Sequence, residues 1–347
     1  MDFYRVFVIA LLWCGLGGLA HPQQGKAGDI PTTVGLDLNT VYLEVVSPPE
    51  LKDRLMVQAR DLFTQYEFSP LATKPLAHHR ATLQLHLMAE PIGALCPDAL
   101  LYEPMITLTS AVLVERKPRP IQVQALTWSS EAPAHTIEKN NALQVIEADG
   151  KEFIEKFIGY NRLSRAAYPE YYTNPPTVPL AGENEPPSFS PRVSTDRAIL
   201  EGLQLDHLEF TFGFWGPLEA LNLDRVKYAA WTEQYKRQFK RFVQSQNPDA
   251  GLSLNQGHSG TINKQLHLSL QIWPAQTACP HLRIYEASMR LSEPVQIKRN
   301  GLSFTSDTWI RRKVSVVKAV DIKQMSADAD ELMAEFISDH KTANPRP

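Results

Sequence analysis

Two stretches of the chain begin with alternating apolar residues and continue with apolar residues spaced as in a helix. The first alternation runs through Leu36, Leu38, Val41, Leu43 and Val45, and it predicts a strand. After Pro48-Pro49, apolar residues recur mostly three or four positions apart, which predicts a helix with one buried stripe: Leu51, Leu55, Ala59, Leu62 and Phe63. The second stretch repeats this order, with a strand from Leu205 to Phe212 and a helix from Leu223 to Phe239.

Three further strands and a closing helix are predicted in each stretch. In residues 288–298, apolar and polar residues alternate, as in a sheet with one wet face. Asn300-Gly301 predicts a tight hairpin turn in the second stretch, and Lys117-Pro118-Arg119-Pro120 predicts a stiffer one in the first. The closing helices are expected at about 141–160 and 326–340. Each stretch therefore predicts the order β-α-β-β-β-α.

The two stretches also match residue by residue, which indicates an internal duplication. The matched anchors are Gly35-Leu36 with Gly202-Leu203, Cys96-Pro97 with Cys279-Pro280, Tyr102-Glu103 with Tyr285-Glu286, Thr127-Trp128 with Thr308-Trp309, and Phe157-Ile158 with Phe336-Ile337. The predicted fold class is α+β, with two repeated domains, each an antiparallel sheet of about four strands with two helices packed on one face. The expected boundaries are 34–161 and 201–341, separated by a proline-rich linker over 162–200.

One sheet face of the first copy is less polar than a wet face usually is. Met105, Thr107 and Thr109 stand where the second copy has Ser288, Arg290 and Ser292. This face is either covered by the other domain, the linker or a partner, or it is a threonine-rich face that tolerates water.

Residues 1–20 have the pattern of a secretory signal peptide. Arg5 precedes the apolar run from Val6 to Leu16, and Gly18-Leu19-Ala20 supplies the small residues of a cleavage site. We therefore expect a periplasmic or extracellular protein. No later apolar run is long enough to span a membrane, so no span is expected after signal cleavage. The 35 Lys and Arg residues and 38 Asp and Glu residues give a net charge of −3 without a strongly basic block, which disfavours a nucleic-acid partner.

Cys96 and Cys279 occupy matched positions in the two copies. If the copies pack around a local twofold axis, these residues meet and form a disulfide, which an exported protein can keep. The sequence does not fix their Cα separation, and two buried, unreactive thiols are the preferred interpretation.

Copper binding is the most specific chemical hypothesis. Cleavage after Ala20 would make His21 the N-terminal residue, whose amine and imidazole together chelate copper, and His78-His79 could complete the site. Against this, Pro22 supplies no amide nitrogen.

The remaining candidates for catalysis are weak. Gly257-His258-Ser259-Gly260 has the wrong glycine spacing for a nucleophile elbow. In Tyr102-Glu103 and Tyr285-Glu286 the neighbouring side chains point to opposite faces of a strand and cannot converge on one atom. His86 and His267 are expected to be surface residues. An enzyme is therefore disfavoured.

The repeated unit resembles a family of short exported bacterial proteins of unknown function. The resemblance depends on Arg299-Asn300-Gly301, Thr308-Trp309, Glu335-Phe336-Ile337 and Ala343-Asn344-Pro345, and more weakly on Thr127-Trp128 and Lys156-Phe157-Ile158. It implies the fold and export, and it implies no activity. This chain differs from the family because it has two units.

The function expected from the sequence is that of a non-catalytic exported module with a protein partner in the cell envelope. The two copies share no set of polar residues that could form a catalytic site, and this favours a role in protein interaction or envelope assembly. The alternatives are a periplasmic copper-binding protein that uses His21 and an enzyme with a site between the domains.

Overall fold

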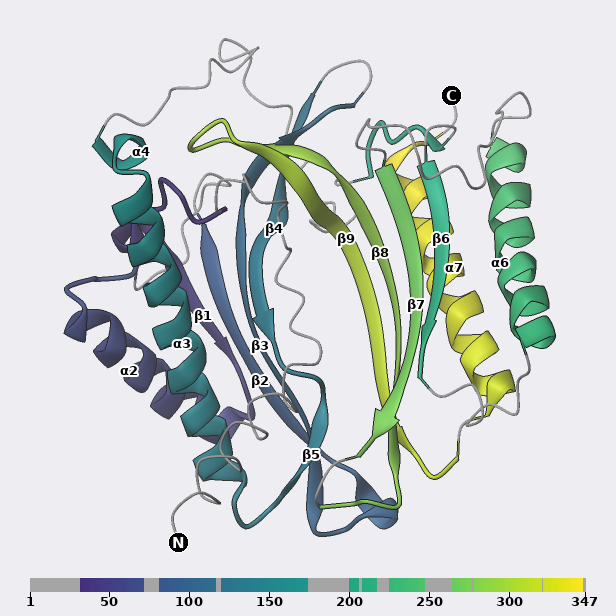
Figure 1. Ribbon diagram of the computed structural model, residues 1–347, viewed down its shortest axis with the longest axis horizontal. Coiled ribbons are helices and arrows are strands. Elements are labelled where there is room, and N and C mark those ends of the chain that lie inside the picture. Colours follow the sequence, from purple (N-terminus) through teal and green to yellow (C-terminus); the bar gives the residue numbers. More distant parts are fainter. Residues whose placement is uncertain are drawn as a thin grey trace, which may run out of the picture.

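The computed structural model describes residues 32–71, 81–116, 120–173, 200–205, 208–216, 225–246, 264–275, 278–319 and 321–345. We call the described residues up to 173 the first half and those from 200 onward the second half. Together they form one mixed α+β fold with a nine-stranded sheet. Helices lie on the two outer sides of the molecule, and the strands lie between them (Figure 1).

The first half contains five strands, three α-helices and two short 3-10 turns. Its strands are β1 (Tyr42–Val46), β2 (Thr82–Pro91), β3 (Ala99–Val114), β4 (Ile121–Glu131) and β5 (His135–Glu138). Its helices are α2 (Pro49–Gln65), α3 (Ala142–Ala167) and α4 (Glu170–Thr173), and the 3-10 turns are Leu38–Thr40 and Gly93–Leu95. Strands β1 and β2 pair in parallel, whereas β2 with β3, β3 with β4 and β3 with β5 pair antiparallel.

Within the described residues, the second half has the same order of elements without counterparts of β5, α4 and the 3-10 turns. It contains β6 (Leu208–Trp215), α6 (Arg225–Gln246), β7 (Lys264–Pro274), β8 (Arg283–Ile297), β9 (Ser303–Val317) and α7 (Ile322–Ala343). Again the first pair, β6 with β7, is parallel, and the next two pairs are antiparallel. A register shift falls after Leu108 in β3 and after Leu291 in β8, opposite the two Thr-Trp pairs.

The predicted size and pairing of the sheets are wrong in two respects. We expected separate antiparallel sheets of about four strands, but β3 and β8 pair at their ends and join all nine strands in one sheet. In addition, each half contains one parallel pair because its first helix forms a crossover between two neighbouring strands.

The cores are also less separate than the sequence indicated. One hydrophobic core lies between α2, α3 and the strands of the first half, and a second lies beneath α6 and α7. The second core includes apolar residues from the β3–β4 hairpin of the first half, namely Val112, Val114, Val123 and Ala125. The two halves therefore share buried surface.

The predicted closing helices are present and are longer than expected. Helix α3 continues to Ala167, so the first residues of the predicted linker are helical. Helix α7 begins after Asp321, whose side chain accepts a hydrogen bond from the Lys323 backbone N–H and caps the helix. Most of the predicted linker, residues 174–199, lies outside the described residues.

Candidate functional site

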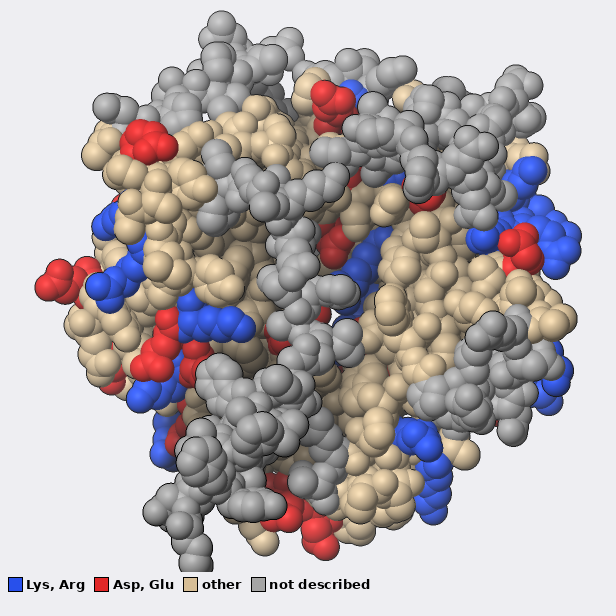
Figure 2. Space-filling view, viewed as in Figure 1, with Lys and Arg blue, Asp and Glu red and all other residues tan. Residues whose placement is uncertain are grey.

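The helix-free sheet faces of the two halves meet in a zone that we call the seam. Tyr102 and Tyr285 are buried in the cores beneath the helices. Their neighbours Glu103 and Glu286 point to the opposite face, as alternation along a strand requires. Acidic and basic side chains are visible in the hollow between the two groups of elements (Figure 2). The seam is therefore the polar interior of the molecule.

Arg312 of β9 is at the centre of the seam. Its Nη2 lies 2.8 Å from a carboxylate oxygen of Glu286 in β8, and its Nη1 lies 3.6 Å from one of Glu103 in β3. One arginine thus contacts carboxylates from both halves. Glu286 is buried, whereas Arg312 and Glu103 are partly exposed.

The two carboxylates compete for this single positive charge. Burial raises the pKa of Glu103, the charges of Glu286 and Glu90 raise it further, and Arg312 only partly opposes them. Glu103 is therefore a carboxyl group that accepts a proton more readily than an exposed glutamate does.

Two histidines lie on the same sheet faces. Burial and Arg312 lower the pKa of His86, and burial and Arg290 lower the pKa of His267. The His267 Nδ1 lies 2.6 Å from the Thr211 hydroxyl. Both lie on the polar face of their strands, as the alternation predicted, and both are only partly exposed.

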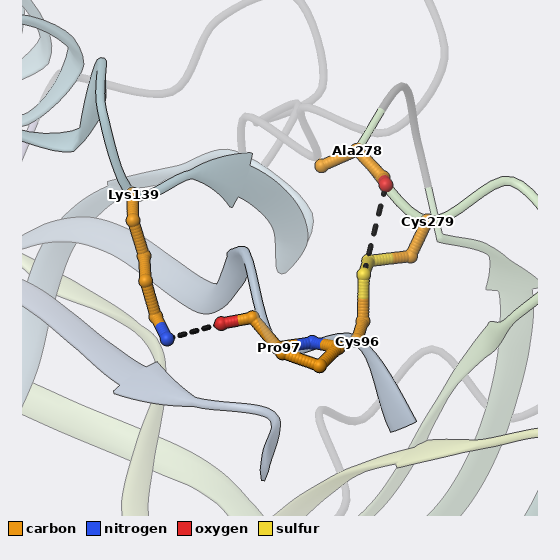
Figure 3. The surroundings of a disulfide bond; sticks show 5 residues. All are labelled: Cys96, Pro97, Lys139, Ala278 and Cys279. Carbon is orange, nitrogen blue, oxygen red and sulfur yellow. Dashed lines mark hydrogen bonds between the residues drawn. A yellow bond between two sulfur atoms is a disulfide. The ribbon is translucent and has the colours of Figure 1, made fainter. Parts of the chain in front are cut away.

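One end of the seam is closed by a disulfide between Cys96 and Cys279. Their Cα atoms are 6.4 Å apart, and Cys279 is fully buried. Figure 3 shows the bond, with the Lys139 Nζ donating a hydrogen bond to the Pro97 carbonyl beside it. Trp273 of β7 donates its indole N–H to the Ala134 carbonyl at 2.6 Å. Of the two interpretations drawn from the sequence, the structure has the bridged one.

The other end is closed by the β3–β4 hairpin, which inserts Arg116 into the second half. Its guanidinium forms a two-pronged ion pair with Glu293 of β8, in which Nη2 lies 2.6 Å from Oε1. Thr308 donates its hydroxyl hydrogen to the same carboxylate at 2.5 Å. The side chains of Arg116 and Glu293 are 1% and 0% exposed, so both charges are buried. We call this group the Arg116 socket.

The β8–β9 hairpin makes the reciprocal insertion with Arg299, in what we call the Arg299 socket. Arg299 donates hydrogen bonds to the Ser110 hydroxyl at 2.9 Å and to the carbonyls of Thr32 and Val34. The neighbouring Asn300 donates to the Val34 carbonyl at 2.6 Å. No carboxylate contacts Arg299 within the described residues, and burial lowers its pKa to about 10.

The two sockets occupy matched positions in the chain. Arg299 follows Arg116 by 183 residues, the separation of the two cysteines, and Glu293 follows Ser110 by the same interval. The two sockets therefore occupy matched positions, but the arginine contacts a carboxylate in the Arg116 socket and a hydroxyl in the Arg299 socket.

The predicted copper ligands cannot be placed. His21, His78 and His79 lie outside the described residues, and so does Gly257-His258-Ser259-Gly260. Within the described ranges, no group of three or more His, Cys, Asp and Glu side chains is arranged to hold a metal ion.

Sequence reasoning did not find Arg312 or the arginine sockets. The available signal was the recurrence of an arginine next to each hairpin turn, but the partners of Arg116 and Arg299 lie in the opposite half of the chain. A repeat comparison aligns Arg116 with Arg299. It does not show that each arginine binds residues of the opposite half.

Comparisons with known proteins do not assign this chain to a family. No family model matches it, and no curated protein does. In the described part of the chain, no helix combines the length and the apolar character needed to cross a membrane. The resemblance to a family of exported proteins stays a prediction.

Proposed function

We propose that the protein is an exported, non-catalytic interaction scaffold whose two halves arose by duplication and are held in a fixed pair. The observation that carries the proposal is the closure of the seam at both ends. A disulfide joins matched cysteines at one end, and two hairpins exchange arginines at the other. Such a frame suits a preorganised binding surface, because little conformational freedom is lost when a partner binds.

Three relations support the duplication. The two halves have the same order of strand pairing, and the register shift in β3 and β8 falls at matched residues. Where β3 meets β8, Val112 pairs with Ile297 and Val114 pairs with Val295. Such reciprocal pairing is the relation that a local twofold axis produces.

Export is supported by the disulfide and by the signal-like N-terminus. A disulfide persists in an oxidising compartment and is rare among reduced cytosolic proteins. We therefore propose a periplasmic or extracellular location. We also propose a protein of the cell envelope as the partner.

The test is affinity purification of the full chain, tagged at its C-terminus and expressed at its native level in its own host. Cells are fractionated first, and free thiols are labelled with a maleimide reagent that shifts electrophoretic mobility. Export predicts protein in the envelope or medium with Cys96 and Cys279 unlabelled. A cytoplasmic protein with labelled thiols would refute that part.

The partner is tested on the same material after mild crosslinking. The scaffold proposal predicts one stoichiometric protein partner that is retained by the wild type. The Glu293→Gln variant, which weakens one end of the frame, should retain less of it. Wild-type protein recovered from the envelope without a stoichiometric partner would contradict the proposal.

A second candidate, an enzyme with its site in the seam, is favoured by one observation. Burial raises the pKa of Glu103, which shares Arg312 with Glu286, and a carboxyl group that holds its proton can act as a general acid. The test is incubation of envelope metabolites with wild-type protein and with the Glu103→Gln variant. Depletion of one compound by the wild type alone would establish an enzyme, and no depletion by either would reject it.

A further inference from the structure

Helix α6 is far more basic than the rest of the chain. It contains six Lys and Arg residues and one acidic residue, Glu233, in a protein of net charge −3. Helix α2, which joins the matching pair of strands in the first half, contains three basic and three acidic residues. The excess of positive charge is thus present in α6 and absent from α2.

Three of the six basic side chains of α6 lie opposite its buried face. The buried face packs into the second core through Trp231, Tyr235, Phe239, Phe242 and Val243. With 3.6 residues per turn, Arg237, Lys240 and Arg241 lie on the other side, and all three are exposed. Lys and Arg side chains gather along the right-hand margin in Figure 2, where Figure 1 places α6.

Among the described residues, few acidic groups neutralise the outward charges of α6. Glu233 pairs with Lys236 at 3.2 Å, and Arg237 donates a hydrogen bond to the Glu233 carbonyl at 3.2 Å. Lys240 and Arg241 make no ion pair with any described residue. The side chains that face outward therefore present positive charge to whatever approaches α6.

The same outward face includes an exposed apolar side chain. Val226 is 78% exposed and lies eleven residues, about three turns, before Arg237, so the two side chains point in nearly the same direction. We call Val226, Arg237, Lys240 and Arg241 the α6 face.

The geometry points to a flat, anionic partner. The charged residues Arg237, Lys240 and Arg241 lie within about one turn of this 22-residue helix, on its outward side. Because the aromatic side of α6 is committed to the core, the helix cannot turn over and insert between lipid chains. Attraction to a charged surface is the interaction that remains.

We propose that the α6 face binds the surface of anionic phospholipid membranes without inserting into them. The proposal rests on export, the part of the proposed function that brings the protein to an envelope membrane. It deepens that function because it gives the scaffold a fixed orientation, with α6 toward the lipid and the first half directed away.

The experiment uses the full-length, oxidised protein and sedimentation with large vesicles. One set contains phosphatidylcholine alone, and the other contains phosphatidylcholine mixed with phosphatidylglycerol. We expect binding to the mixed vesicles only, with weaker binding as salt shortens the range of the charges. The Arg237→Gln/Arg241→Gln double variant should bind roughly tenfold to thirtyfold more weakly, because each removed charge contributes about a factor of five near a membrane.

The matched control is Lys52→Gln/Arg60→Gln on α2, which removes two exposed positive charges from the first half. It should bind within about twofold of the wild type if the binding is local to α6. Circular dichroism confirms that both double variants are folded.

Three outcomes would overturn the proposal. Equal losses in the two double variants would show that total charge matters and the α6 face does not. Equal binding to neutral vesicles would remove the electrostatic basis. Tighter binding to heparin or duplex DNA than to the anionic vesicles would assign the face to a polyanion. The vesicle test does not depend on cell fractionation, so a failure of export is seen separately.

Discussion

Reduction of the Cys96–Cys279 disulfide gives the clearest measure of how the two halves are held. The bond joins residues 183 positions apart, so it closes a very long loop in the unfolded chain. In the chain-entropy treatment, a loop of this length lowers the entropy of the unfolded state enough to contribute about 5 kcal/mol at 25 °C. Since folded domains are commonly stable by about 5–15 kcal/mol, this is a large share of the total.

The assay is equilibrium unfolding in urea, with and without a reducing agent, followed by tryptophan fluorescence and circular dichroism. We expect reduction to lower the free energy of unfolding by about 5 kcal/mol. The Cys96→Ala/Cys279→Ala variant should match the reduced wild type to within about 1–2 kcal/mol, the allowance for removing one buried and one partly buried sulfur atom. Adding reductant to this variant should change nothing, which controls for effects of the reagent.

Two results would refute this reasoning. A loss below about 1 kcal/mol would show that the cross-link does not restrict the unfolded chain as assumed. A peptide map of the unreduced protein without a Cys96–Cys279 fragment would show that the bridge is absent. Unfolding in two separate steps after reduction would show in addition that each half unfolds independently.

Three further predictions concern the sockets, the seam and the first turn. Glu293→Gln should cost about 3–5 kcal/mol of stability because it leaves a buried guanidinium without its carboxylate. Ser110→Ala in the other socket should cost about 2 kcal/mol, because the Ser110 hydroxyl forms hydrogen bonds with both Arg299 and Thr127. Equal losses in denaturant melts would contradict the assigned pairing. The pKa of Glu103 is raised on folding, so its contribution to stability is complete below the unfolded pKa near 4.5 and is lost as pH rises through the folded pKa. Glu103→Gln should therefore become more stable relative to the wild type as pH rises. Urea midpoints of the two proteins that change in parallel with pH would contradict this. Gly35→Ala should lower the stability of the protein by about 1–2 kcal/mol, because the φ angle of Gly35 is +70° and a Cβ there would lie 3.3 Å from the Tyr171 carbonyl oxygen. Gly159→Ala is the control, because Gly159 lies in α3 with open space around it. This variant should raise the stability by about 0.5–1 kcal/mol in the same melts.

Much of the local structure could be predicted from the sequence because it depends on neighbours along the chain. The apolar spacing from Leu51 to Phe63 corresponds to α2, and the alternation from Ser288 to Lys298 corresponds to most of β8. The joining of the two sets of strands could not be predicted in this way. It depends on three residue pairs between β3 and β8, far apart in sequence, and no periodic pattern encodes such a pairing.

The candidate site was harder to predict for the same reason. The repeat identifies Glu103 and Glu286 as a matched pair, and strand alternation correctly predicts that they point away from Tyr102 and Tyr285. No sequence pattern identifies Arg312. Its significance arises because β9 brings it between carboxylates from both halves. The α6 face was also missed. A count over the whole chain gives −3 and conceals a helix that is locally strongly basic.

Differences between matched residues are more informative about function than the matches themselves. The cysteines and the two hairpin arginines recur in both halves, and each contributes to the frame. At matched positions that differ, Glu293 replaces Ser110 and the basic helix α6 replaces the balanced helix α2. The disulfide and the arginine contacts each use residues from both halves, whereas the charge on the outer side of α6 takes no part in them. The proposed duplication and the proposed membrane binding are consistent with this difference, because a basic α6 beside a balanced α2 gives only one of the two helices a charged outer face.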